Sequence, residues 1–412
     1  MTYKVAGIDI HKKVLMVVVT DAAAEEEGEW ESRRFGTVAS EREHLVAWLQ
    51  ERGVQEIVME STAQYWKPIW LDLEPHFHPL HLAQAHSNRA PKGRKRDFAD
   101  AQRLTRRLLA GELILSFVPD AEQRGWRTIT RAKVQLVHDR VRLQNQLEAL
   151  LEETRVKLSS VVSELLGLSG RRILQAMAEG ESDPAELAKL GDFRLHCSQE
   201  ELADALRGQW QPLHRQMLQL FLERLGLLDR QIQQLDRMAA ETMQPYEEAV
   251  IRLAEVPGLG PDSAQQIIAE VGAQAKSFPS AGEFASWAGL CPGSDESAEH
   301  NYSSRSPKGN PFLRRVLTQA AQAAVKTKRS HFQVVFRRWL PRLGYQAAIW
   351  AIAHKLGRLV WKILHDGVHY KERGERSHPT VQRRRARRMV QALRNMGYKV
   401  EISSLNPQPA QG

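Results

Sequence analysis

The stretch KVAGIDIHKKVLMVVVT, residues 4–20, decides the fold of the N-terminal part of the chain. Two apolar runs rich in β-branched residues, KVAGIDI and VLMVVVT, flank the short segment HKK, and this pattern predicts a β-hairpin. Asp9 lies inside the first run, where a charge is costly unless it is paired or bound to a metal. The stretch therefore predicts a sheet with an acidic group near the end of its first strand.

With the two strands of the hairpin, the segments that follow predict an order of three strands, a helix, and then strands alternating with helices. Ser40 is expected to cap the first helix, with Glu43 three residues later and Gly53 closing it. Another helix is expected from near Asp97 to Gly111, after a basic loop. This order is that of a ribonuclease-H-like fold. The further strands are expected within residues 30–39, 56–61 and 78–84, and a short helix within residues 65–76.

The rest of the chain reads as helical, so the predicted fold class is α/β plus all-α. Leucines at heptad intervals within residues 122–245 predict a long antiparallel coiled-coil stalk, with an ordinary helical bundle core as the alternative. Two packed helices, 312–326 and 344–367, are expected in a helical domain spanning 246–370. We predict four parts: residues 1–115, 122–245, 246–370 and a basic tail, 371–412.

The composition favours a polyanionic partner. The chain has 412 residues and a net charge of +9, from 58 Lys and Arg against 49 Asp and Glu. Its two cysteines, Cys197 and Cys291, lack metal-ligand spacing, which argues against a disulfide framework or a cysteine zinc site.

No apolar run approaches the roughly 20 residues of a membrane span, and no signal peptide is evident, so we expect a cytoplasmic protein.

Several basic or glycine-containing segments are candidates for contacts with nucleic acid. The segment 253–272 resembles a helix-hairpin-helix, whose turn can hold a DNA phosphate on backbone N–H groups, although similar turns serve as plain connectors. Asn310 is a candidate helix cap. The candidate contacts are Lys92, Arg94, Lys95, Arg96, Gly258, Gly260, Arg305, Lys308, Arg383, Arg384 and Arg385.

Four carboxylates are candidate metal ligands. Asp9 and Glu60 end predicted strands, and Asp97 and Asp100 are spaced to project from one face of a helix start. Together they could hold two Mg²⁺ ions, which stabilise the attacking and leaving oxygens of a phosphoryl displacement. Each also has a simpler interpretation: Asp97 as a helix cap, for example, or Glu60 as a solvated strand end.

Sequence motifs across nearly the whole chain point to one family. The sequence resembles the DEDD transposases of the one-ten insertion-sequence family, whose N-terminal domain is similar to RuvC-type Holliday junction nucleases. The family's acidic tetrad falls on the same four carboxylates. The motifs are GIDIHKK, VMESTAQYW and RDFADAQRL, then VPGLGPDSAQQIIAEVG, FASWAGLCPGSDESA, KGNPFLRR and AIAHKLGRLVWKILHDGVHY.

The resemblance implies more than the residues alone. It implies a transposase guided by a non-coding RNA of the element, with donor and target DNA as partners and dimers joined into a tetramer. It also implies a serine that attacks the DNA backbone and holds it covalently. That serine corresponds to Ser297, in DESA after Pro292. AEHNYSSRSP, which follows, departs from many relatives in being less basic, with Glu299 and a proline.

The residues themselves leave the nucleophile and the reaction open. Without the resemblance, Ser297 is not distinguishable from four neighbouring serines, and no histidine at a fixed spacing would activate it. Two alternatives remain: a metal-dependent nuclease, resembling a Holliday junction resolvase, that forms no covalent intermediate, and a non-catalytic nucleic-acid-binding protein. The rival serines are Ser294, Ser303, Ser304 and Ser306.

Overall fold

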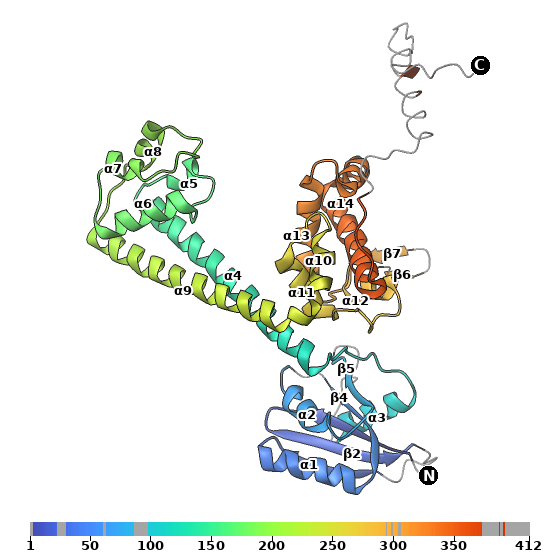
Figure 1. The fold of residues 1–412 in the computed structure, drawn as a ribbon. Helices are drawn as coiled ribbons and strands as arrows, with labels where there is room; N and C mark the ends of the chain where they lie inside the picture. The colour runs from blue at the N-terminus through green and yellow to red at the C-terminus, as the bar shows by residue number, and fades with distance from the viewer. Residues whose placement is uncertain are drawn as a thin grey trace, which may run out of the picture. The chain divides into compact units, whose positions relative to one another are not determined.

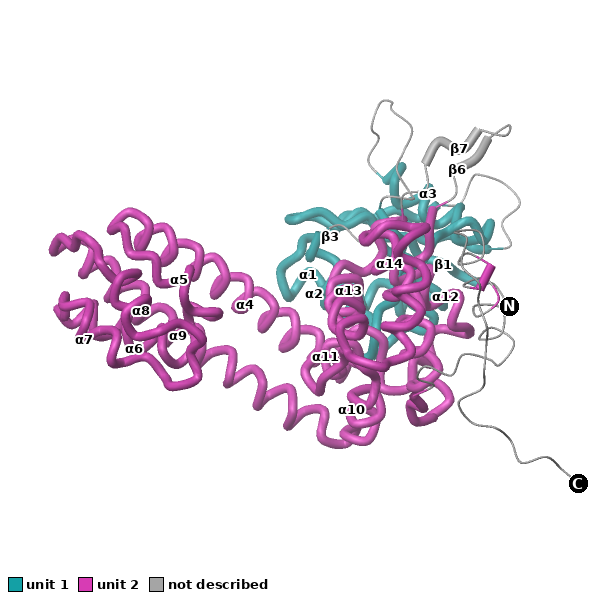
Figure 2. Tube along the Cα trace, turned by 90° about the horizontal axis from the view of Figure 1, so that it is seen from above, with its two compact units in different colours: residues 1–120 teal, residues 121–412 magenta. Residues whose placement is uncertain are grey.

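The chain forms two compact units, residues 1–120 and 121–412 (Figure 2). The second unit contains both the predicted stalk and the predicted C-terminal helical domain. In this computed structural model the described residues are 3–22, 30–60, 63–85, 98–293, 295–297, 300–303, 306–372, 387, 390 and 391, with the backbone alone at 295–297 and 300–303.

Unit 1 is built on a five-stranded mixed sheet. The strand order is β3-β2-β1-β4-β5, with β1, β2 and β3 antiparallel and β4 and β5 parallel to β1 (Figure 1). The predicted hairpin is confirmed by β1 and β2, and the sheet is consistent with a ribonuclease-H-like domain. The strands are β1 (Lys4–Ile10), β2 (Val14–Asp21), β3 (Glu31–Gly36), β4 (Val54–Glu60) and β5 (Leu80–Ala83).

Helices cover both faces of this sheet. On one face, α1 (Ala39–Glu51) and α2 (Trp66–Leu73) bury side chains such as Leu45 and Ile69 against Ile8. On the other face, Leu104 of α3 (Ala99–Leu109) packs with Val58. Since successive side chains of a strand point to opposite faces, the odd-numbered residues of β1 face α3.

Helix α1 begins earlier than predicted, and Ser40 does not cap it. Its N-cap is Val38, which makes no side-chain hydrogen bond to the helix start. The Glu41 carboxylate accepts a hydrogen bond from the backbone N–H of Gly36 at 3.1 Å, and Arg42 donates to the carbonyl of Thr37 at 2.8 Å. These contacts fix the turn before the helix, so Ser40 lies within its first turn.

Two long helices of unit 2, α4 (Ala121–Glu153) and α9 (Pro212–Thr242), pack against each other in opposite directions. Lys133 pairs with Asp236 and Arg140 with Asp229, so the partners run in reverse order along the two helices. The predicted leucine stripes contribute to their common core. Four short helices lie between them in sequence: α5 (Leu158–Val161), α6 (Leu168–Glu179), α7 (Pro184–Lys189) and α8 (Gln199–Ala205).

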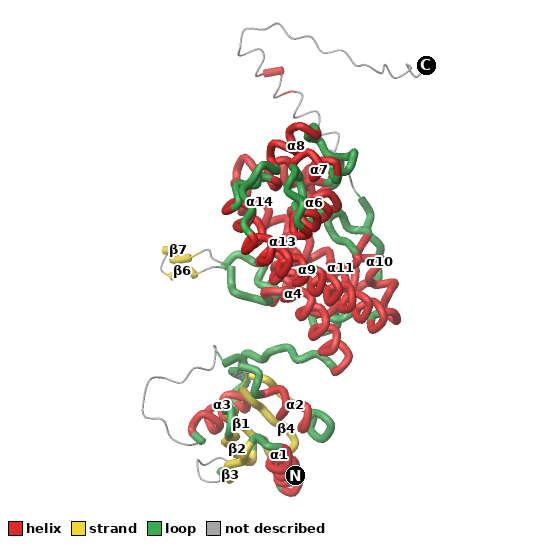
Figure 3. Tube along the Cα trace, turned by 90° about the vertical axis from the view of Figure 1, so that its left-hand side faces the viewer, coloured by secondary structure: helices red, strands yellow, loops and turns green. Residues whose placement is uncertain are grey.

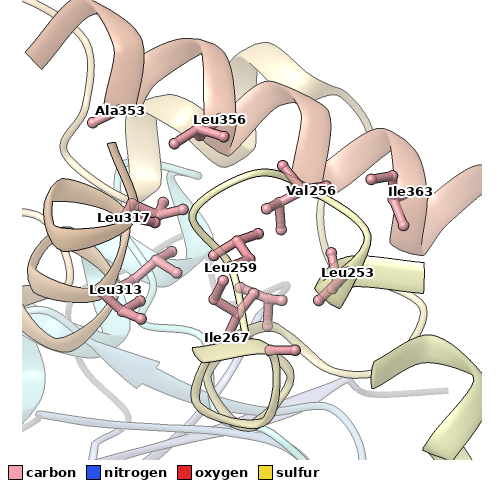
Figure 4. Close-up of a cluster of buried hydrophobic side chains, with 14 of the residues drawn as sticks. Leu253, Val256, Leu259, Ile267, Leu313, Leu317, Ala353, Leu356 and Ile363 are labelled. Carbon is pink, nitrogen blue, oxygen red and sulfur yellow. The ribbon is translucent and has the colours of Figure 1, made fainter. Parts of the chain in front are cut away.

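The C-terminal part of unit 2 is a helical core, and Figure 3 shows how helices dominate this unit. Leucines and isoleucines from five segments meet in its centre, including Leu253, Ile267, Leu317 and Leu356 (Figure 4). The elements are a 3-10 turn (Gln244–Tyr246), α10 (Glu247–Ala254), α11 (Pro261–Val271), α12 (Ala281–Trp287), β6 (Asp295–Ser297), β7 (His300–Ser303), α13 (Pro311–Lys326) and α14 (His331–Asp366).

The segment α14 consists of two helices joined at a break, because Gly344 has a non-helical backbone conformation with φ of +73° and ψ of +170°. The second helix therefore follows Gly344, as predicted, and the sequence did not predict the first, which begins at His331 after the Ser330 cap. The polar segment between α12 and α13 contains the antiparallel pair β6–β7, which the sequence did not predict. No helix within the described residues is long and apolar enough to cross a membrane.

Candidate active site

Two carboxylates lie side by side at the carboxyl ends of neighbouring parallel strands. The register pairs Gly7 with Val58 and Ile8 with Met59, so the next positions, Asp9 and Glu60, are adjacent. Both belong to the set of strand positions that faces α3, opposite the apolar face covered by α1 and α2. The alternation that buries Ile8 therefore turns both acidic groups toward α3.

Helix α3 brings a third carboxylate to this face. Asp100 lies in its first turn and accepts a hydrogen bond from Arg103 at 2.6 Å. His11, just after β1, lies 3.1 Å from the Asp9 carboxylate through Nε2. Both basic side chains thus sit among the acids, and neither was expected at the site from the sequence.

The electrostatics of this cluster favour binding of a cation. Burial raises the pKa of the Asp9 carboxyl, and repulsion from Asp100 adds to the rise, against the opposing effects of His11 and Arg103. Burial also raises the pKa of Glu60, where Asp9 and Asp100 add to it and Arg103 opposes it. These carboxylates destabilise one another when ionised, so a bound cation would relieve their repulsion. Hard oxygen donors of this kind suit Mg²⁺.

The predicted set of four ligands is described only in part. Asp97 lies outside the described residues, and α3 begins at Ala99 after Phe98, whose φ is +67°. The expectation that Asp97 and Asp100 project from one face therefore stays a prediction. Within the described ranges, no three His, Cys, Asp or Glu side chains form a group able to hold a metal ion.

Ser297 ends strand β6, and its Cα pairs with that of His300 in β7. Its side chain lies outside the described residues. The chain leading into and out of this hairpin is held by a close contact between two glycines, Gly289 and Gly309, with φ of +72° and +52°. A Cβ added at Gly309 would come within 2.4 Å of the Ala288 carbonyl oxygen, so only glycine fits there without a shift.

The outgoing end of the hairpin is anchored on the helices. Asn310 caps α13, accepting from the N–H groups of Phe312 and Leu313 at 3.0 and 3.1 Å, which confirms its predicted role. Its amide also donates to the buried carboxylate of Glu270 at 2.7 Å. The backbone on which Ser297 is carried is therefore tied to the helical core.

Of the candidate contacts with nucleic acid, only Gly258, Gly260 and Lys308 lie among the described residues. A Cβ at Gly258 would meet the Ala320 carbonyl oxygen at 2.2 Å, so this glycine has a packing role against α13. Gly260 has open space around it at the start of α11, and Lys308 is exposed. The remaining candidates lie outside the described residues: Lys92, Arg94, Lys95, Arg96, Arg305, Arg383, Arg384 and Arg385.

Comparison with known proteins gives two matches in the order expected for one family. Residues 6–156, which include the acidic face, match the DEDD transposase domain of IS110 elements. Residues 251–336, which include Ser297, match the domain described as "Transposase IS116/IS110/IS902 family". The chain belongs to the IS110 family of transposases.

Individual transposases are similar over most of this chain. A Pseudomonas aeruginosa protein described as "Probable family 20 transposase" is 28% identical over 66% of this chain and 73% of its own length. The transposase for insertion sequence element IS1328 of Yersinia enterocolitica is 24% identical over 67% of this chain and 74% of its own. Membership of this transposase family implies DNA cleavage and rejoining.

Sequence reasoning missed three residues that shape the transposase's candidate site. Arg103 follows Asp100 by three helical positions, a spacing that predicts a contact between them. Gly7 and Glu270 carry no local signal, because their importance comes from segments distant in sequence. Gly7 lies against α3, and Glu270 lies against α4.

Proposed function

We propose that this transposase cuts and rejoins DNA through a covalent serine–DNA intermediate, with Asp9, Glu60, Asp97 and Asp100 as metal-binding carboxylates and Ser297 as the nucleophile. The observation that carries the proposal is the acidic face of unit 1, where Asp9 and Glu60 end adjacent strands and burial raises the pKa of both, with Asp100 adding to each rise. Such groups are typical of a site that performs chemistry with a bound cation.

The assignment of Ser297 is supported by its sequence setting and by the way its hairpin is held. It lies in DESA, within the segment that matches the family. The paired glycines and the Asn310 cap hold the chain at residues 289 and 309–310, on either side of the hairpin, and a catalytic group needs a supported base to keep its geometry.

The proposed reaction proceeds by two exchanges at phosphorus. The Ser297 Oγ attacks a DNA phosphodiester, a serine–phosphate ester forms, and one sugar oxygen leaves as a hydroxyl that takes up a proton. A hydroxyl of another DNA end then attacks the ester and releases the serine, so the number of phosphodiesters is conserved. A bound divalent cation would supply Lewis-acid stabilisation of charge on the phosphoryl oxygens.

The proposed partners are the donor and target DNA and a non-coding RNA from the same element that pairs with both. We further propose that dimers join into a tetramer, since recombination requires four DNA strands to be cut and exchanged. These partners follow from the family resemblance.

The experiment compares single variants on the element's own DNA ends with RNA and Mg²⁺. Wild-type protein should give a DNA–protein adduct on a denaturing gel, and Ser297→Ala should abolish the adduct while RNA binding is retained. Asp9→Asn should abolish both adduct formation and strand cleavage.

Three other outcomes would contradict the proposal in whole or in part. Cleavage that persists in Ser297→Ala without any adduct would identify a metal-dependent nuclease that hydrolyses DNA directly. Nucleic-acid binding with no cleavage, unchanged by Asp9→Asn, would identify a binding protein. An adduct that persists in Ser297→Ala would assign the nucleophile to another residue.

A further inference from the structure

An open groove lies beside the outgoing end of the Ser297 hairpin. Two adjoining hollows, of about 710 and 790 Å³, share Lys308, Arg314 and Trp350 along their walls. We call them together the α13–α14 groove, because apart from Lys308 and its neighbours the walls come from these two helices. Hollows of this size lie within the usual range for small-ligand sites, roughly 300–1,000 Å³.

The charge of this groove is one-sided. Its walls contain three cationic side chains, Lys308, Arg314 and Arg315, and no carboxylate. Among the described residues, no carboxylate lies within ion-pair distance of these three. The hollow between α9 and α10, by contrast, includes Glu247 and Glu255. A hollow lined by one sign of charge concentrates a ligand of the opposite sign.

Arg315 is partly buried in the wall of this groove. Its Nη2 donates to Gln266 at 2.5 Å, but its buried Nε–H has no hydrogen-bond partner among the described residues. Burial lowers the pKa of its guanidinium, with Asp262 opposing the effect. A partly buried guanidinium with no carboxylate in direct contact is stabilised when a phosphate or carboxylate enters the groove.

Aromatic and amide groups complete the groove. The Arg314 guanidinium lies over the Trp350 ring, 4.7 Å from its centre, and the indole N–H donates to the Ser306 hydroxyl at 3.0 Å. Gln319 and Gln322 are exposed on the α13 wall. Stacked Arg–Trp pairs offer a platform for nucleobases, and amides can both donate to and accept from base edges.

We propose that the α13–α14 groove binds an unpaired stretch of nucleic acid, with phosphates held by Lys308 and Arg315 and a base stacked at Trp350. Hollows of about 710 and 790 Å³ have room for single nucleotides. The inference rests on the proposed function, since it gives the nucleic-acid strand that leads to the Ser297 hairpin a binding site of its own. The same chemistry would receive a DNA strand or the guide RNA.

The test measures binding of fluorescein-labelled octanucleotides, oligo-dT and oligo-U, to the full-length protein without metal. Gln322→Glu places a negative charge in the groove and should weaken binding roughly fivefold or more, about the loss of one stacked base. Ala323→Glu is the matched control: the site is exposed on the same helix, gives the same charge change and does not line the groove.

Equal weakening by the two variants, or none by either, would overturn the inference. Tighter binding of oligo-dT would assign the groove to the DNA strand, and tighter binding of oligo-U would assign it to the guide RNA. Photocrosslinking with 5-iodouracil should label Trp350, and labels confined to other regions would also contradict the assignment. Because no metal is present, these results stand whether or not Ser297 forms an adduct.

Discussion

Gly7 sets how closely helix α3 approaches the sheet. A Cβ at this position would come within 2.1 Å of the Thr105 hydroxyl oxygen and 2.5 Å of the Ala101 carbonyl oxygen. The absence of a side chain allows α3 to lie directly on β1. Since α3 carries Asp100 and β1 carries Asp9, one glycine controls the spacing of the acidic face.

We therefore expect Gly7→Ala to destabilise the protein by about 1–3 kcal/mol, the usual cost of overpacking a tight contact. It should also reduce metal-dependent cleavage in the fraction that remains folded, because α3 must move away from β1. Thermal unfolding and cleavage assays measure the two effects.

Gly125→Ala is the control for this substitution. Gly125 lies on an exposed turn of α4 with open space where its Cβ would be, so alanine should raise helix stability by up to about 1 kcal/mol. Equal stability of Gly7→Ala and wild type would show that the β1–α3 contact is looser than described.

At the scale of elements, a buried ionic cluster joins three helices of unit 2. Glu270 of α11 is 3% exposed and accepts two hydrogen bonds from Arg131 of α4, each 2.8 Å long. Arg127 lies 3.4 Å from the same carboxylate, and burial lowers the pKa of this arginine to about 10. Asn310 adds a fourth contact at the start of α13.

Removing the carboxylate should leave the mostly buried Arg127 without its partner and take both hydrogen bonds from Arg131, whose side chain is 37% exposed. We expect Glu270→Ala to lower the free energy of unfolding by about 3–5 kcal/mol, as in other buried ion pairs that lose one member. Urea denaturation measures this. Glu186→Ala, which removes an exposed pair with Lys189, should leave stability unchanged. Similar losses in both variants would contradict the role of the cluster.

A separate prediction concerns Gly289 and Gly309, the two glycines in close contact at the root of the Ser297 hairpin. Gly309→Ala should reduce adduct formation while most of the fold is retained, because the added methyl pushes the root away from Ala288. Gly282→Ala, with nothing closer than 3.7 Å, should behave as wild type. The adduct yield per folded molecule is compared between Gly309→Ala and Gly282→Ala. Equal yields would argue that the contact between Gly289 and Gly309 does not position the hairpin.

The sequence predicted elements where their pattern was local. Apolar runs rich in β-branched residues predicted β1 and β2, and heptad leucines predicted α4 and α9. The hairpin β6–β7 was missed because DES and HNYS lack an apolar alternation. Ser40 was misread because the turn is fixed instead by Glu41 and Arg42, a choice that the polar residues around them do not reveal.

The residues of the candidate site also differ in whether a local sequence signal reveals them. Asp9 and Glu60 stood out because each interrupts or ends an apolar run, a signal that needs no other segment. Glu270 looked like an ordinary helix residue, since its burial depends on arginines about 140 positions earlier. The groove around Trp350 was likewise hidden, because its walls come from two helices and the hairpin root.

For the whole molecule, the net charge of +9 predicts binding that depends strongly on salt. A protein that neutralises six phosphates of duplex DNA loses about a thousandfold in affinity between about 50 and 200 mM salt. We expect a fall of this order for the element's DNA ends, measured by titration at several salt concentrations. A nearly flat response would exclude extensive phosphate contacts.

The most direct test of the central proposal is mass spectrometry of the trapped DNA–protein adduct after nuclease and protease digestion. The account predicts a nucleotide linked through phosphate to Ser297, and no adduct when Asp9 is replaced by asparagine. A nucleotide on Ser294, Ser303, Ser304 or Ser306, or DNA cut by wild-type protein with no linked peptide, would contradict it.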